Sequence, residues 1–104
     1  MQAGAIVILS LINPSEKYWG QLHTLAAPGV TLRGINLSSF EDWMLAVARE
    51  TQPALGPSTV FFPMNRVERM FLDEQVGDIE SLAQRFERSV GRRVEDVLGP
   101  IPPT

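Results

Sequence analysis

Residues 58–74, STVFFPMNRVERMFLDE, indicate how the last two strands of the chain are arranged. Two short runs rich in β-branched and aromatic residues flank the linker PMNR, residues 63–66. A two-residue hairpin turn favours Asn-Gly or Asp-Gly, because its central residues take positive φ angles. Pro63 instead holds φ in a narrow negative range, and only Asn65 of the linker tolerates left-handed geometry. The linker therefore predicts a 3₁₀-like turn that sends the second strand off at a steep angle, so that the two strands need not pair.

The composition limits the classes of protein to which the chain can belong. The chain has 104 residues, the length of one domain, and we expect residues 1–104 to form a single unit. Hydrophobic residues make up 44% and charged residues 20%, as in globular proteins. Cysteine is absent, which excludes disulfides and thiolate chemistry. The net charge of -3 argues against non-specific nucleic-acid binding, which usually requires an excess of Lys and Arg.

An apolar run at residues 5–12 predicts a first strand that is buried on both faces. No Lys or Arg precedes the run, as a signal peptide would require, and it is too short to span a bilayer. Asn13-Pro14-Ser15 after it predicts a turn. These features predict a cytoplasmic protein without a membrane segment.

Further strands are predicted on both sides of a helical segment. Residues 18–26 and 30–37 are candidate strands, and Pro28-Gly29 between them is a strong turn pair. The apolar face switches across Arg33-Gly34, which predicts a bulge or sharp bend there, with Gly20 in the preceding strand as the alternative position. Residues 59–62 and 67–72, from the opening stretch, complete a set of five strands.

Two helices are predicted from apolar periodicity and capping residues. The first, over about 39–50, begins with Ser39 as its cap. Its apolar stripe, which we expect to pack on the sheet, with a partner groove as the alternative, consists of Phe40, Trp43, Met44 and Val47. The second, over about 78–98, begins with Asp78 as its cap and passes a C-cap at Gly91. The proline-rich tail, residues 99–104, is predicted to be extended and frayed.

Two sequence patterns carry a resemblance to a known family. Gly20-Gln21-Leu22 is followed by a turn and the apolar strand Val30-Thr31-Leu32, and residues 58–74 form an apolar strand, a tight turn and a final strand. In this order, over about residues 5–73, the chain resembles the Sm-like family, which includes bacterial Hfq. The resemblance implies a mainly β fold with added helices: a five-stranded, strongly bent antiparallel barrel in the order β-β-β-α-β-β-α.

The same resemblance implies a non-enzymatic module that assembles into homo-oligomers or acts as an adaptor. In the Sm-like family the final strand of one subunit pairs with the fourth strand of the next, in a head-to-tail contact. Apolar strand edges without such cover favour aggregation. The residues expected at this interface are Thr59, Val60, Phe61, Phe62, Met70, Phe71 and Leu72.

An RNA-binding post-transcriptional regulator in the manner of Hfq is the alternative that the resemblance leaves open. The family contacts RNA in the loop after the second strand and at the corner between the fourth and fifth strands. The loop reads AAPG here, residues 26–29, and lacks the family's Asn, whereas the corner offers Asn65 and Arg66. RNA binding is therefore expected to be weak and to depend on this corner.

The sequence offers no recognisable set of residues for catalysis or metal binding. His23 is the only histidine, so a zinc site would lack its usual ligands. Neither a glycine-rich phosphate loop nor a nucleophile elbow occurs. A basic cluster interleaved with acids is typical of a solvated helix face, and a patch for RNA or an acidic partner is the alternative; it comprises Arg85, Arg88, Arg92 and Arg93. We expect no enzymatic activity, no metal and no cofactor.

Overall fold

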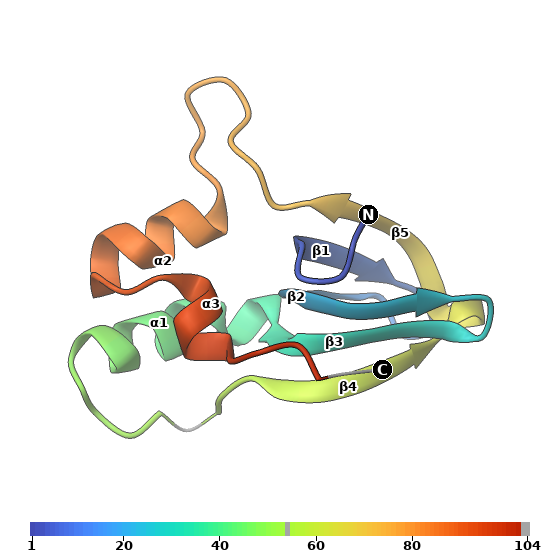
Figure 1. The fold of residues 1–104 in the computed structure, drawn as a ribbon, viewed down its shortest axis with the longest axis horizontal. Helices are drawn as coiled ribbons and strands as arrows, with labels where there is room; N and C mark the ends of the chain where they lie inside the picture. The colour runs from blue at the N-terminus through green and yellow to red at the C-terminus, as the bar shows by residue number, and fades with distance from the viewer. Residues whose placement is uncertain (54, 103–104) are drawn as a thin grey trace.

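A computed structural model describes residues 1–53 and 55–102 of the chain (Figure 1). The strands are β1 (Ile6–Leu11), β2 (Glu16–Ala26), β3 (Gly29–Asn36), β4 (Ser58–Pro63) and β5 (Val67–Leu72). The helices are α1 (Phe40–Ala48), α2 (Leu82–Val90) and α3 (Val94–Leu98), with the 3₁₀ turns η1 (Leu37–Ser39) and η2 (Met64–Arg66). The strands lie close to their predicted ranges, and β5 matches residues 67–72 at both ends.

All five strands belong to one antiparallel sheet with the order β4-β3-β2-β1-β5. β4 and β5 are consecutive in the chain, yet they form the two edges of the sheet. The turn η2 lies between them, so the predicted corner in place of a hairpin is confirmed. The predicted barrel is confirmed only as a five-stranded antiparallel sheet: the sheet does not close in the described part of the chain, and with its helices it makes a mixed α/β fold.

Two glycines let β2 and β3 approach each other closely. Gly20 lies directly opposite Gly34 in the sheet. A Cβ atom on Gly20 would lie 2.4 Å from the Arg33 carbonyl oxygen, and one on Gly34 would lie 2.2 Å from the Trp19 carbonyl oxygen. No side chain fits there without displacing backbone. The register shift of this ladder falls between Leu22 and Thr24 of β2, on the strand of the alternative position Gly20 and not at Arg33-Gly34.

A first hydrophobic cluster joins the helices to one face of the sheet. Trp19 and Ile35 contribute from the strands, and the ring of Trp43 stacks on Phe86 at 4.9 Å between centroids. Phe86 belongs to α2, and the remaining buried members come from α1 and α3: Phe40, Met44, Val94 and Leu98. Trp43 is only 3% exposed, which confirms that the apolar stripe of α1 packs inward. In Figure 1 the three helices gather beside one end of the sheet.

A second cluster fills the opposite face of the sheet. Its buried members come from β1 to β4 and are Val7, Leu9, Leu11, Leu22, Val30, Leu32 and Phe62. Val67 and Met70 of β5 pack against it. Because Ile6 and Ile8 pack against the first cluster, β1 is buried on both faces, as its sequence predicted.

The helix ends correct the capping predictions. Ser39 makes no side-chain cap for α1; the Asn36 side chain accepts a hydrogen bond from the Ser38 N–H at the start of η1 instead. The predicted helix 78–98 is two helices, and Ser81, not Asp78, caps α2. Gly91 ends α2 with φ of 78°, as predicted.

The segment between β5 and α2 explains that correction. Residues 76–79 form a tight turn closed by reciprocal backbone hydrogen bonds between Val76 and Ile79, which prevents a helix from starting at Asp78. The predicted frayed tail falls partly on Pro103 and Thr104, which lie outside the described residues. None of the helices in residues 1–53 and 55–102 is long and apolar enough to cross a membrane.

Candidate functional site

The outer edges of β4 and β5 present unpaired backbone groups. The Met64 N–H donates to the Pro28 carbonyl oxygen at 2.9 Å, which sets the alternation of the β3–β4 ladder. By that alternation Phe62 faces β3, whereas Thr59 and Phe61 direct their backbone groups away from the sheet. Pro63 also faces outward, so its missing N–H removes no bond to β3.

The same reasoning places the outward groups of β5. The Asp73 N–H donates to the Ile6 carbonyl oxygen at 2.9 Å, so the backbone of Phe71 faces β1. Met70 and Leu72 therefore direct their backbone groups outward. Each edge strand has two outward residues near the end that faces away from η2.

The side chains of the predicted interface divide into two groups. Phe62 is 4% exposed and belongs to the second cluster, against which Val60 and Met70 also pack. Three apolar side chains remain on the surface: Phe61 (54% exposed), Phe71 (39%) and Leu72 (42%). Thr59 is also exposed. The surface group provides an apolar edge on each side of the sheet, and the other residues hold that edge in place.

Arg66, predicted to contact RNA, is engaged within the chain. Its guanidinium donates to the carbonyl oxygens of Ile12 (3.0 Å) and Pro14 (2.9 Å) and to a carboxylate oxygen of Glu16 (3.1 Å). These contacts fasten η2 to the turn between β1 and β2. Asn65 beside it is exposed. The structure thus places one predicted RNA residue on the surface and gives the other a structural role.

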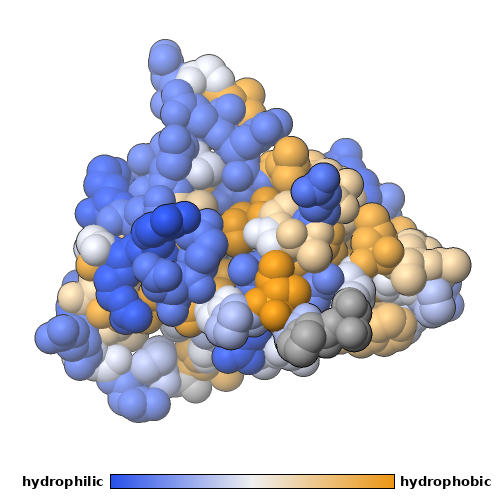
Figure 2. Space-filling view, in the orientation of Figure 1, coloured by the Kyte–Doolittle hydropathy of each residue, from blue (hydrophilic) through white to orange (hydrophobic). Residues whose placement is uncertain are grey.

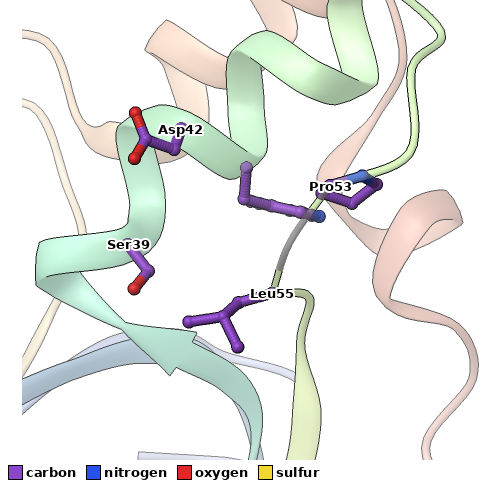
Figure 3. A pocket seen from close by; sticks show the side chains of 5 residues that line it. Ser39, Asp42, Pro53 and Leu55 are labelled. Carbon is purple, nitrogen blue, oxygen red and sulfur yellow. The ribbon is translucent and has the colours of Figure 1, made fainter.

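Three shallow hollows lie elsewhere on the described surface. The first, of about 70 Å³, is lined by Ser39, Asp42, Trp43, Pro53 and Leu55. Figure 3 shows Ser39 and Asp42 across this hollow from Pro53 and Leu55. A neighbouring hollow of about 150 Å³ shares Ser39 and Leu55 with it. Both are smaller than the roughly 300 Å³ at which ligand pockets usually begin.

The third hollow is larger and more open. It measures about 450 Å³ and is lined by Gln21, Glu95, Asp96, Gly99, Pro100 and Ile101. Gln21 Oε1 is buried with no hydrogen-bond partner within residues 1–53 and 55–102, and so is His23 Nε2. His23 lies at the register shift of β2 and is 8% exposed. No group of three or more His, Cys, Asp or Glu residues in the described part of the chain could hold a metal ion.

Asp73 connects three elements of the fold, a role that the sequence analysis did not predict. Its carboxylate accepts hydrogen bonds from Trp19 Nε1 (3.0 Å) and from the backbone N–H groups of Leu82 and Ala83 (2.8 Å each). One side chain therefore ties the end of β5 to the centre of β2 and to the N-terminus of α2, where a negative charge is favoured. The Trp19 contact spans 54 positions of sequence, and no local pattern indicates it.

No family model, no curated protein and no solved structure matches this chain.

Proposed function

We propose that the chain is a non-enzymatic, Sm-like assembly or adaptor module whose copies join through the outer edges of β4 and β5. The observation that carries the proposal is the position of these two strands. Consecutive in sequence, they form opposite edges of one sheet, and each presents outward backbone groups beside exposed apolar side chains. Joining the β4 edge of one copy to the β5 edge of another would satisfy both.

The short turn η2 supports the Sm-like part of the proposal. Four neighbouring strand spacings of about 4.8 Å separate the edges of a flat five-stranded sheet, about 19 Å in total. Yet η2 joins β4 to β5 with three residues. The side chains near it also meet across the sheet, with the rings of Tyr18 and Phe62 at 4.8 Å. This arrangement favours a sheet that bends toward a small barrel.

The composition of the edges favours pairing over protection. Edge strands are commonly guarded by Lys or by inward-pointing charges. β4, STVFFP, contains no charged residue, and the charged residues of β5, Glu68 and Arg69, lie in its first half. The unguarded parts are Thr59–Phe61 and Met70–Leu72, and each contains two of the residues whose backbone groups face outward.

RNA binding in the manner of Hfq is the alternative function. The three hydrogen bonds of Arg66 leave little of its guanidinium to meet a phosphate, and its side chain is only 25% exposed. No other feature of the corner favours RNA. The assembly module is therefore the function that the geometry supports best.

Light scattering coupled to size-exclusion chromatography tests the proposal. We expect a mass that is a multiple of the 11.5 kDa of one chain. Phe61→Lys should shift the mass toward that of one chain, because a charge on the edge opposes strand pairing. Leu25→Lys is the matched control, since Leu25 is 48% exposed and lies away from both edge strands. A wild-type mass near 11.5 kDa at every concentration would refute the proposal.

A further inference from the structure

A projecting loop, residues 74–80, carries the most exposed apolar side chains in the described part of the chain. We call it the finger. Ile79 is 75% and Val76 67% exposed. The two are paired across the turn, because each N–H donates to the other's carbonyl oxygen at 3.0 Å. Figure 1 shows the finger extending away from both the sheet and the helices.

The finger is held in one shape by hydrogen bonds. Gln75 Nε2 donates to the Gly77 carbonyl oxygen at 2.9 Å, and Gln84 of α2 donates to Gln75 Oε1 at 3.1 Å. Glu80 pairs with Arg88, whose hydrogen bond holds the pKa of Glu80 below its usual range. Asp73 anchors the start of the finger. Preorganisation of this kind lowers the entropy cost of binding.

The finger is also acidic. Its sequence, EQVGDIE, has three carboxylates and no basic residue. Glu80 is paired, whereas Glu74 and Asp78 form no ion pair with the residues that the structure describes. In Figure 2 the finger, at the top, shows mostly hydrophilic (blue) surface with a hydrophobic (orange) area beside it. A binding surface that complements an apolar tip and two free carboxylates is itself apolar and basic.

The chain itself carries such a surface on β2 and β5, which we call the basic patch. Ser10 of β1 lies directly opposite both Lys17 and Arg69, so the three side chains form one row on the same face. Lys17 and Arg69 are exposed, and they flank the buried Ser10. Phe71, 39% exposed, lies two positions along β5 on the same face.

We propose that the finger of one copy docks on the basic patch of the next copy, with Val76 and Ile79 against Phe71 and with Glu74 and Asp78 facing Lys17 and Arg69. This inference rests on the proposed function and names a second contact in the same assembly. Stable interfaces usually bury at least roughly 1,200 Å², and each edge strand contributes only six residues. The finger supplies additional apolar area, and its carboxylates make the contact specific for a basic surface.

The contact joins two different surfaces, so it is heterologous, as is the pairing of β4 with β5. Arg69 approaches its neighbour Glu68 only at 3.9 Å, with both side chains more than half exposed, which leaves it free to meet a carboxylate. The finger projects away from the sheet that carries the patch of its own chain, and the proposed contact is therefore made with the patch of another copy (Figure 1).

Charge reversal with complementation tests the inference. Asp78→Arg and Arg69→Glu should each weaken self-association by at least about tenfold, because like charges would then face each other. An equimolar mixture of the two variants should recover the wild-type mass, because each finger then meets a patch of opposite charge. Glu50→Arg is the control, since Glu50 is exposed at the end of α1 and belongs to neither surface.

The outcomes separate this inference from the proposed function. If Phe61→Lys dissociates the assembly but Asp78→Arg and Arg69→Glu leave its mass unchanged, the finger contact is refuted and the edge contact stands. Failure of the mixed variants to recover the wild-type mass, with both folded by circular dichroism, also refutes the finger contact. A wild-type chain that is monomeric throughout refutes both.

Discussion

Replacing Asp73 with Ala should lower the free energy of unfolding more than any other single change to a half-buried polar residue in the chain. The carboxylate accepts three hydrogen bonds, one from the indole of Trp19 and two from the first turn of α2. The N–H of Gln84, the next residue along α2, donates to Ser81 Oγ at 3.0 Å. The Ser81 N–H donates to Gln84 Oε1 at 2.7 Å. Asp73, Ser81 and Gln84 together therefore satisfy the four N–H groups at the start of this helix that lack a partner within it.

The expected loss in free energy of unfolding can be worked out from the hydrogen-bond donors that Asp73→Ala leaves without an acceptor. Trp19 is 0% exposed, so its indole N–H would lose its partner in the protein interior. A buried donor without a partner costs about 1–3 kcal/mol, and the loss of a helix cap costs about 1 kcal/mol. Because hydrogen bonds to a charged group are worth about 1.5–3 kcal/mol each and are not additive, we expect a total of about 3–5 kcal/mol. That is a large part of the roughly 5–15 kcal/mol that stabilises a typical domain.

Urea unfolding at fixed protein concentration, followed by tryptophan fluorescence and circular dichroism, measures this effect. Ser89→Ala is the control: this exposed residue of α2 belongs to neither proposed contact, and a change within about 0.5 kcal/mol is expected. A double-mutant cycle with Trp19→Phe should give a coupling energy between about 0.5 and 3 kcal/mol. An Asp73→Ala variant within about 0.5 kcal/mol of the wild type, with an unchanged m-value, would contradict this account of the β5–α2 junction.

Three further changes test other parts of the structure. Gly34→Ala should destabilise the sheet by at least about 1–3 kcal/mol in thermal unfolding, because its Cβ would meet backbone, whereas Gly56→Ala, with open space around it, should not. Trp43→Ala should cost about 3–5 kcal/mol in urea unfolding, and a loss under about 0.5 kcal/mol would contradict its place in the core. Arg66→Ala should lower the free energy of unfolding by about 1–3 kcal/mol and leave any affinity for a uridine- or adenine-rich oligonucleotide unchanged. A selective loss of sub-micromolar RNA binding in this variant would support RNA binding as the function instead.

Local chemistry accounts for the parts of the fold that the sequence determined. Pro63 restricts its own φ, and the PMNR linker lacks a residue pair for a two-residue hairpin, so a 3₁₀ corner follows from four residues alone. The length of β5 and the C-cap at Gly91 follow in the same way from neighbouring residues. The continuous apolar run of β1 predicted burial on both faces, because successive side chains of a strand point to opposite faces of the sheet.

Where residues compete for a local role, the sequence did not decide the outcome. Asp78 and Ser81 are both good helix caps, and the sequence pattern favoured Asp78 because Ile79 continued the apolar period. The hydrogen bonds between Val76 and Ile79 close a turn, and Ser81 with Gln84 forms the capping box instead. That difference turned a predicted helical turn into the exposed finger.

The contacts between residues far apart in the sequence depend on the tertiary fold. The order β4-β3-β2-β1-β5 makes β4 and β5 the open edges, and the same side-chain pattern would also suit a closed barrel. Asp73 reaches Trp19, and Arg66 reaches Glu16, across 54 and 50 positions of sequence. Such contacts depend on where the backbone brings distant residues together. The periods of helices and strands carry no information about that, so the role of Arg66 as a fastener and the basic patch around Ser10 became visible only in the folded chain.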